Sequence, residues 1–240
     1  MHYTDGEKPW AILPLKSISF SNSRLMPILT MHERRKLSLI MLKDVVSILN
    51  CAPGVGGLLV VTKCKIMKTH CQALGVTVLE EDGPPHLNTA IVQAVQFLGS
   101  LGIEKFFTVP GDVPLLNLSE LDILVRSLQV SEGLTLVPSR DGMGTNSIAS
   151  KIPLHVQPRF GVDSLSEHHR IAKDNGISVE ILPLKGFGFD IDWPSDLVRL
   201  ASIGNSSRTQ GYLSSLDLEY RKHPVYEKNF SRFEKIEGLG

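Results

Sequence analysis

The chain has 240 residues, 42% of them hydrophobic, and its 25 Lys and Arg residues balance its 25 Asp and Glu residues. This apolar content is enough for a full core, in one large domain or two small ones. The charge balance excludes a global field that would attract nucleic acid or a membrane surface, so any anion site must be local. No apolar run approaches the ~20 residues of a membrane span. We therefore expect neither nucleic acid nor membrane as a partner.

The cysteines and the N-terminus indicate the compartment. Cys51, Cys64 and Cys71 are odd in number and lack zinc-ligand spacing, so a disulfide framework is not expected. Residues 1–8 are polar and carry no signal-peptide apolar region. A reducing cytoplasm is the predicted location.

Apolar runs typical of buried strands alternate along the chain with segments whose apolar residues recur at spacings of three and four. The predicted strands are residues 10–15, 58–62, 76–80, 105–108, 134–138, 147–150, 177–184 and 187–191. The predicted helices are residues 31–50, 63–74, 87–101, 119–131 (capped by Ser119), 164–175 and 194–203. This alternation predicts one α/β domain over residues 1–204, with three αβα layers and a mixed, mostly parallel sheet.

Residues 205–240 form a predicted C-terminal extension, which is Ser-rich and then charged. Its five aromatic residues are Tyr212, Tyr220, Tyr226, Phe230 and Phe233, too many for a purely solvated tail. We expect the extension to dock on the core or on a partner subunit, as in a homodimer, with partial disorder as the alternative.

The segment Val109–Leu116, which reads VPGDVPLL, follows the predicted strand 105–108. Gly111 and the prolines on either side end the strand, so Asp112 should sit just past its C-terminal end, where ligands bind in open α/β sheets. A carboxylate in that place can hold a divalent metal. The alternative is a turn aspartate that caps its own backbone.

Two further carboxylates, Asp190 and Asp192, end the predicted strand 187–191. Side chains alternate along a strand, so both can face one side, alongside Asp112. The alternative is that they cap the helix beginning near Pro194.

The loop after the first predicted strand carries Lys16 and Arg24, with Ser21 and Ser23 between them. Cations and hydroxyls in this place suit the phosphates of a nucleotide. The loop is not a P-loop, because Gly-x-x-x-x-Gly-Lys is absent. A solvated surface loop is the alternative.

Two more loops have features of anion sites. The glycines of residues 139–146 let backbone N–H groups approach an anion closely, unless this is an ordinary hairpin loop. Residues 160–164 lead into a predicted helix, whose N-terminal amides favour a phosphate or carboxylate, unless Asp163 or Ser164 is a plain N-cap. Together with the carboxylates and cations, these loops predict nucleotidyl transfer from a nucleoside triphosphate to a phosphorylated acceptor.

Seven motifs in order resemble the 2-phospho-L-lactate guanylyltransferase family of deazaflavin coenzyme (factor 420) biosynthesis, which includes phosphoenolpyruvate and 3-phosphoglycerate guanylyltransferases. They cover about residues 10–200 and are Leu13-Pro14-Leu15-Lys16 with Ser23-Arg24-Leu25; Met41-Leu42-Lys43-Asp44-Val45; Leu87-Asn88-Thr89-Ala90; Pro110-Gly111-Asp112-Val113-Pro114-Leu115; Gly144-Thr145-Asn146; Phe160-Gly161-Val162-Asp163-Ser164 with His168; and Asp190-Ile191-Asp192.

The resemblance implies a nucleotide-diphosphosugar transferase-like fold and transfer of GMP from GTP to a phosphorylated three-carbon acid, with release of pyrophosphate. It implies Mg²⁺ on Asp112, Asp190 and Asp192, with Lys16, Arg24 and Asp112 catalytic. It also implies nucleotide contacts from Leu13, Lys16, Arg24, Leu87, Asn88, Pro110 and Asp112, and acceptor contacts from Thr145, Asn146, Gly161 and Ser164.

The chain departs from the family pattern in three places. Asn22 stands where a lysine is frequent, His86 stands where glycine is usual, and we assign no counterpart to residues beyond Asn205. Two alternatives follow: another nucleotidyltransferase of this fold, acting in molybdenum-cofactor or sugar-phosphate chemistry, and a regulatory nucleotide-binding homologue without turnover. The first usually opens with a Leu-Ala-Gly-Gly loop, which Pro14-Leu15-Lys16 replaces here.

Overall fold

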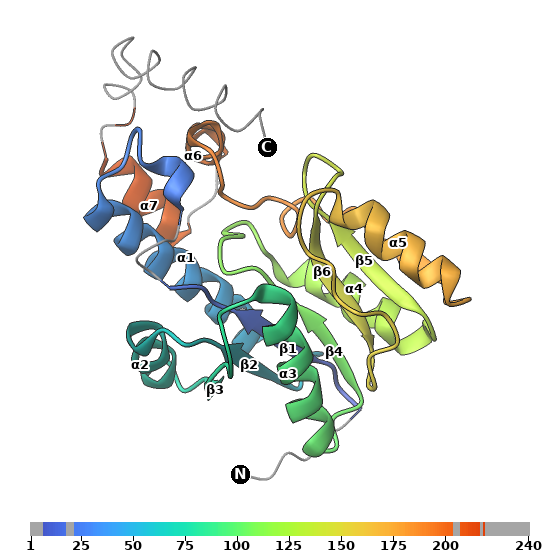
Figure 1. Cartoon of the computed structure of the whole chain (residues 1–240). Coiled ribbons are helices and arrows are strands. Elements are labelled where there is room, and N and C mark those ends of the chain that lie inside the picture. The colour runs from blue at the N-terminus through green and yellow to red at the C-terminus, as the bar shows by residue number, and fades with distance from the viewer. Residues whose placement is uncertain (1–6, 18–21, 204–206, 217, 219–240) are drawn as a thin grey trace.

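A seven-stranded sheet runs through the centre of the molecule (Figure 1). The computed structural model describes residues 7–17, 22–203, 207–216 and 218. Its strands are β1 (Trp10–Pro14), β2 (Gly57–Val61), β3 (Thr77–Leu79), β4 (Lys105–Thr108), β5 (Leu134–Pro138), β6 (Thr145–Lys151) and β7 (Val179–Ile181). Its helices are η1 (Ser23–Leu25), α1 (Met31–Cys51), α2 (Lys65–Ala73), α3 (Leu87–Ser100), α4 (Leu118–Val130), α5 (Ser164–Asp174), α6 (Pro194–Ser202) and α7 (Arg208–Ser214).

The strand order is β3-β2-β1-β4-β6-β5-β7. The neighbours β1–β2, β2–β3, β1–β4 and β5–β7 are parallel, and β6 runs antiparallel to β4 and β5. The chain proceeds from β1 through β2 to β3 on one side and then returns to place β4 on the other side of β1. The strand order therefore reverses between β1 and β4, the kind of position at which open α/β sheets bind ligands beyond the carboxyl ends of their strands.

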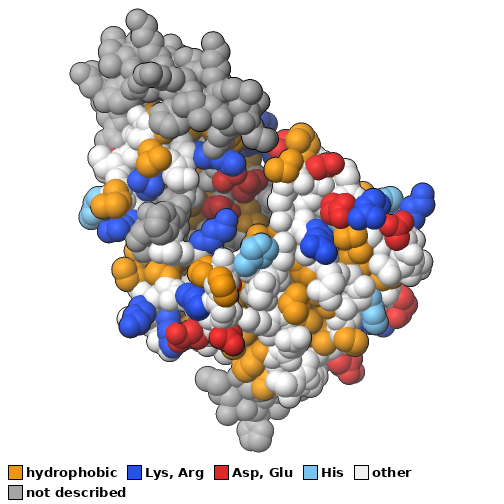
Figure 2. Space-filling model, viewed as in Figure 1, with side chains coloured by type: hydrophobic (Ala, Val, Ile, Leu, Met, Phe, Trp, Pro, Cys, Tyr) orange, Lys and Arg blue, Asp and Glu red, His pale blue; other side chains and the backbone are white. Residues whose placement is uncertain are grey.

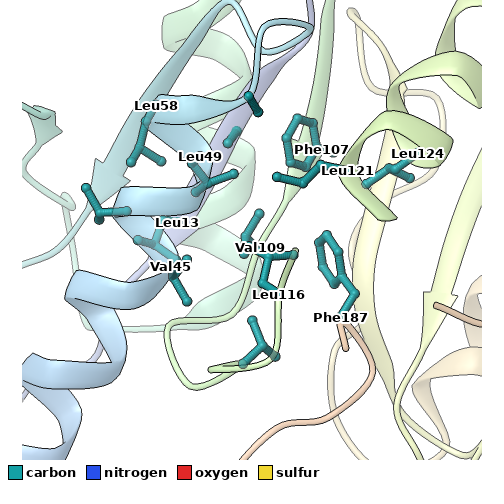
Figure 3. Close-up of a cluster of buried hydrophobic side chains, with 14 of the residues drawn as sticks. Leu13, Val45, Leu49, Leu58, Phe107, Val109, Leu116, Leu121, Leu124 and Phe187 are labelled. Atoms are coloured by element: carbon teal, nitrogen blue, oxygen red, sulfur yellow. The ribbon is translucent and has the colours of Figure 1, made fainter. Parts of the chain in front are cut away.

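Helices cover both faces of the sheet. On one face, α1, α2 and α4 pack on the strands through a buried cluster that includes Leu13, Val45, Phe107, Leu121 and Phe187 (Figure 3). On the other face, α3 and α5 pack through a second cluster centred on α3. Each fully buried apolar side chain of this size contributes roughly 1.5–3 kcal/mol. The predicted α/β class, three layers and mixed, mostly parallel sheet are confirmed.

A third buried cluster lies outside these layers, and α6 and α7 pack there against α1. It joins Leu25 of η1, Phe189 and Ile191 of the segment before α6, and Tyr212 and Leu213 of α7. The cluster therefore ties α7 to two of the segments that carry predicted site residues.

The buried carboxylate of Asp44 on α1 anchors α7. It accepts hydrogen bonds from the backbone N–H of Thr209 at 2.9 Å and from the Thr209 hydroxyl at 2.7 Å. It also pairs with the Arg208 guanidinium at 3.1 Å. A carboxylate at a helix N-terminus satisfies amides that have no partner within the helix, so the start of the predicted extension docks on the core.

Two sequence predictions are wrong. Residues 187–191 are not a strand, because the backbone N–H groups of Gly186 and Phe187 donate to the carboxylate of Glu120, at 2.9 and 2.8 Å, instead of to a neighbouring strand. A side chain at Gly186 would meet the Leu115 carbonyl oxygen, so the chain can turn there only with glycine. The cap of α4 is Asn117, whose side chain accepts from the Glu120 N–H, and not Ser119.

The domain boundary predicted between 204 and 205 lies outside the described residues, as do Tyr220, Tyr226, Phe230 and Phe233. Among the described helices, none is both long enough and apolar enough to cross a membrane. The cytoplasmic location and the homodimer remain predictions.

Candidate active site

Asp112 lies just past the end of β4, as predicted. The loop that carries it is held at both sides: Val109 N–H donates to the Ile12 carbonyl of β1 at 2.8 Å, and Ile191 N–H donates to the Asp112 carbonyl at 3.0 Å. The second bond brings the Asp190–Asp192 segment to the carboxyl end of β4. Figure 2 shows a hollow between the side of the molecule that carries α6 and the side that carries β6, with acidic side chains inside it and Lys or Arg side chains at its edge.

The three predicted metal ligands are close enough to act on one another. Burial, followed by the negative charges of Asp192 and Asp190, raises the pKa of Asp112 to about 7, although Lys16 opposes this shift. Burial and Asp192 also raise the pKa of Asp190, against a hydrogen bond from Asn146. Carboxylates that desolvate and repel one another favour protonation unless a cation joins them.

Their donor set fits Mg²⁺. Within the part of the chain that the structure describes, no three His, Cys, Asp or Glu side chains are already gathered as a metal cage. Mg²⁺ does not need one, because it is typically bound by one or two carboxylates together with substrate phosphates and water. Asp112 and Asp190, with Asp192 beside them, offer the hard oxygen ligands and the concentrated negative charge that such a site requires.

Arg24 connects the predicted phosphate loop to these carboxylates. Its guanidinium forms an ion pair with Asp192 at 2.7 Å and lies over the Trp193 ring, 4.8 Å from the centroid. Both charged side chains are more than 40% exposed, so the pair itself contributes little to stability. Arg24 on η1 and Lys16 after β1 thus place two cations beside the acidic cluster.

Arg140 makes a related contact that the sequence did not indicate. Its guanidinium pairs at 2.5 Å with Asp196, which is almost fully buried, and stacks over the Phe189 ring. The other oxygen of Asp196 accepts the backbone N–H groups of Asp192 and Trp193. Asp196 therefore caps α6 and fixes the backbone of Asp192 at once.

Neighbouring residues at the start of β6 serve opposite faces of the sheet, as alternation along a strand requires. Asn146 donates to the Asp190 carboxylate at 3.2 Å and to the Phe187 carbonyl at 3.1 Å. Thr145 points the other way, to His168 of α5 at 3.0 Å. The structure thus sets Asn146 against Asp190 and Thr145 against His168 of α5.

That loop brings Gly161 and Ser164 toward β6. Gly161 has φ +156° and Asp163 has φ +53°, so the backbone turns sharply before α5. Ser164 Oγ accepts the Thr145 N–H at 2.9 Å, and Leu165 N–H donates to the Met143 carbonyl. Three of the four predicted acceptor residues, Thr145, Gly161 and Ser164, are therefore on adjoining segments.

The glycine-rich loop 139–144 satisfies part of its own backbone. The Asp141 carboxylate accepts Met143 N–H at 2.9 Å, and the Ser139 hydroxyl accepts Gly144 N–H at 2.8 Å. Hydrogen bonds from Ser139 and from these amides lower the pKa of Asp141. The amides of Met143 and Gly144 therefore already have partners within the loop.

The remaining predicted nucleotide residues occupy varied positions. Leu13 is fully buried inside the sheet and Pro110 is half-buried, so a nucleotide contact from Leu13 stays a prediction. Leu87 is the first residue of α3. The Asn88 side chain accepts Phe160 N–H at 2.8 Å and so joins α3 to the loop before α5.

The two departures inside the domain are accommodated. His86 has φ −152°, an extended conformation that does not require the usual glycine. Asn22 has φ +52°, a left-handed conformation that asparagine tolerates, and its amide donates to the Ser38 hydroxyl at 3.1 Å. Neither residue strains the backbone around the site.

Comparison with known proteins agrees with this geometry. The family model described as "Guanylyl transferase CofC like" matches residues 10–232. The chain belongs to this guanylyltransferase family. The match extends well past Asn205, so the C-terminal region has a counterpart in the family, contrary to the sequence-based assignment. The protein is accordingly a nucleotidyltransferase-family enzyme.

Relatives of this guanylyltransferase family differ in the acid for which they are named. A phosphoenolpyruvate guanylyltransferase of Conexibacter woesei is 30% identical over 86% of this chain and 96% of its own length. A 2-phospho-L-lactate guanylyltransferase of Methanosphaera stadtmanae is 29% identical over 91% of this chain and 97% of its own. A putative nucleotide-diphospho-sugar transferase from Desulfovibrio desulfuricans superposes with a TM-score of 0.72 over 89% of this chain and 97% of its own, at 14% identity, and confirms the fold.

Some residues of this candidate site have no local sequence signal. Glu120 holds the backbone of Gly186 and Phe187, and Arg140 holds Asp196, through contacts between residues far apart in the chain. Asp196 in turn holds the backbone of Asp192, four residues earlier. His168 was grouped with Ser164 only through the family motif, and no role was predicted for it. Its spacing of four from Ser164, which puts both side chains on one face of α5, is the signal that could have grouped them.

Proposed function

We propose that this guanylyltransferase moves GMP from GTP onto a phosphorylated three-carbon acid, namely 2-phospholactate, phosphoenolpyruvate or 3-phosphoglycerate, as a step in deazaflavin coenzyme biosynthesis. The observation that supports this most strongly is the group of Asp112, Asp190 and Asp192 at the strand-order reversal between β1 and β4, with Lys16 and Arg24 beside it. The names of the relatives supply the classes of donor and acceptor.

The chemistry follows from charge. An oxygen of the acceptor's phosphate attacks the α-phosphorus of GTP, the bond to the bridging oxygen breaks, and pyrophosphate leaves. The attacking group is already an anion near neutral pH, so no general base is required. The obstacle is repulsion between two polyanions, and Lys16 and Arg24 reduce it by neutralising phosphate charge and holding the reactants in line.

Asp112 and Asp190, with Asp192, would hold Mg²⁺. When bound, the ion polarises the phosphoryl oxygens and neutralises charge that develops in the transition state. Arg24 pairs with Asp192 at a partly exposed position, and it would exchange this carboxylate for a phosphate of the nucleotide. Thr145 and Ser164, where β6 begins beside Asn146, would donate hydrogen bonds to the acceptor.

Pyrophosphate release tests this proposal. We expect release when GTP, Mg²⁺ and one of the three acids are all present, and none when any of them is omitted or when CTP replaces GTP. The product should contain GMP joined to the acid's phosphate, which mass spectrometry would identify. Release that depends on a sugar phosphate instead of these acids would contradict the proposal, and so would GTP binding without turnover on any acid.

A further inference from the structure

His168 is a fully buried histidine whose two ring nitrogens both have partners. The backbone N–H of Arg159 donates to Nε2 at 2.7 Å, and Nδ1 lies 3.0 Å from the hydroxyl oxygen of Thr145. The Phe160 ring packs edge-on against the imidazole, with 5.2 Å between centroids. These contacts leave the imidazole little freedom to turn.

The contact with Arg159 determines the tautomer. A backbone N–H can only donate, so Nε2 must be an unprotonated acceptor, and a neutral imidazole then carries its proton on Nδ1. Burial lowers the pKa of His168 to about 4, so the ring is neutral near pH 7. A hydrogen bond to the Ser164 backbone opposes this shift, which is consistent with a proton on Nδ1.

The tautomer in turn determines the role of Thr145. Because Nδ1 carries the proton, the Thr145 hydroxyl cannot donate to it and can only accept, so the hydroxyl's own hydrogen must point elsewhere. The same logic applies to Ser164, whose oxygen accepts Thr145 N–H at 2.9 Å. Two hydroxyls on adjoining segments are thus engaged as acceptors inside the protein, and neither of these hydrogen bonds uses the hydroxyl's own hydrogen.

We propose that His168 is a positioning residue that orients the Thr145 hydroxyl, in concert with Ser164, to donate to an anionic group of the acceptor. Ionised phosphates and carboxylates accept hydrogen bonds but cannot donate them, so a pair of fixed donors is matched to such a group. This inference rests on the proposed function, because that function makes Thr145 and Ser164 the acceptor side of the site.

Two variants of His168 separate the contact with Thr145 from the contact with Arg159. His168→Gln can place a carbonyl oxygen near Nε2 to accept Arg159 N–H, but has no donor for Thr145. His168→Asn can place an amide N–H near Nδ1 to donate to Thr145, but has nothing for Arg159. His169 is exposed on the same helix, so His169→Gln is the matched control.

Steady-state kinetics of pyrophosphate release should distinguish them. We expect His168→Gln to raise the KM for the acceptor about tenfold, as for one lost hydrogen bond to a charged group, while the KM for GTP stays within about twofold. His168→Asn should recover most of the loss, and adding His168→Gln to Thr145→Val should change the acceptor KM little further. The proposal is wrong if His168→Asn has a higher KM for the acceptor than His168→Gln, or if the KM for GTP rises together with the KM for the acceptor.

The tautomer itself can be measured without turnover. In ¹⁵N-labelled wild-type protein near pH 7, NMR should show His168 as the neutral form protonated on Nδ1, and calorimetry with phosphoenolpyruvate should show weaker binding to His168→Gln than to His168→Asn. A proton on Nε2, or a charged ring, would overturn the proposal. If no acid supports pyrophosphate release, the proposed function fails, while these two measurements still decide the role of His168.

Discussion

At the scale of single residues, Asp112 is buried among like charges, which favours its protonated form, whereas binding a cation requires its ionised form. Its position past β4 buries the carboxyl group near Asp190 and Asp192, and this raises its pKa to about 7. The folded protein therefore binds this proton more tightly than the unfolded chain, whose Asp112 has the usual pKa of 3.8. As a result, Asp112 lowers the free energy of unfolding as the pH rises from 3.8 toward 7. A bound cation would reverse that preference.

Asp112→Asn should remove magnesium-dependent turnover without unfolding the protein. The substitution deletes a charged ligand from a site whose Lewis-acid contribution is typically several kcal/mol, so we expect a fall of about 10²-fold or more in pyrophosphate release at limiting Mg²⁺. The metal-free variant should melt at or above the wild-type temperature at pH 8, because one of three mutually repelling carboxylates is gone.

Asp122→Asn is the control for Asp112→Asn. Asp122 is an exposed aspartate of α4, paired with Arg126 one turn later. Its substitution should change neither pyrophosphate release at limiting Mg²⁺ nor the melting temperature. Turnover close to wild type in Asp112→Asn at limiting Mg²⁺ would reject Asp112 as a metal ligand.

Several residue positions could be predicted because they depend on local rules. Asp112 follows a strand and is bounded by Gly and Pro, and Ser164 begins a helix after a glycine turn. The grouping of Asp112 with Asp190 and Asp192 was predicted from strand ends, but most hydrogen-bond partners could not be, because they are distant in the chain. Asn146 was expected to bind the acceptor, yet its amide contacts Asp190, 44 residues away.

At the scale of elements, periodicity predicted the strands of the sheet and the helices that pack on it. It failed at residues 187–191, where the apolar side chains are buried without the backbone pairing in the sheet. The alternating Phe187, Phe189 and Ile191 look like a strand, but Phe187 packs in one buried cluster and the other two in the cluster with α6 and α7. The backbone of this segment is held by the side chain of Glu120, 66 residues from Gly186. A contact between residues this far apart cannot be predicted from the local sequence pattern.

Glu120→Gln should loosen the segment that presents Asp190 and Asp192. Glutamine has one carbonyl oxygen for two backbone N–H donors, and its NH₂ group would face one of them, which costs about 1–3 kcal/mol. We expect a lower melting temperature and a higher Mg²⁺ concentration for half-maximal turnover, with the acceptor KM unchanged. Glu132→Gln, at an exposed ion pair with Lys151, should affect neither stability nor Mg²⁺ dependence.

If the melting temperature of Glu120→Gln falls while its Mg²⁺ dependence stays constant, Glu120 supports the fold and not the proposed metal side of the site. A rise in the acceptor KM of similar size would show instead that the two sides of the site are not separated by β6 as the contacts of Thr145 and Asn146 suggest.

At the scale of the whole molecule, the two halves of the site depend on different parts of the structure. Thr145, Gly161 and Ser164 lie where β6 meets α5. Arg24 and the Asp190–Asp192 segment instead rest on the cluster completed by α7, through Leu25 and Ile191. Helix α7 is therefore far along the chain but close in packing to Arg24 and the Asp190–Asp192 segment.

Ending the chain after Ser202 should weaken that side selectively. The truncation removes Tyr212 and Leu213 from the third buried cluster, at roughly 1.5–3 kcal/mol each, and leaves the buried Asp44 carboxylate without its α7 partners. We expect a marked fall in melting temperature and a higher KM for GTP with Mg²⁺, while the preference among acids is retained. A chain ending after Leu218 keeps α7 and is the matched control.

Since the truncated chain could lose too much stability to assay, Leu213→Ala provides a milder version of the same change. A buried leucine truncated to alanine typically costs about 2–5 kcal/mol, and its kinetic effect should again fall on GTP and Mg²⁺ and not on the acceptor. The role assigned to α7 is wrong if the chain ending after Leu218 loses as much stability as the one ending after Ser202. It is equally wrong if loss of α7 changes which acid is guanylylated, because α7 would then act on the acceptor side.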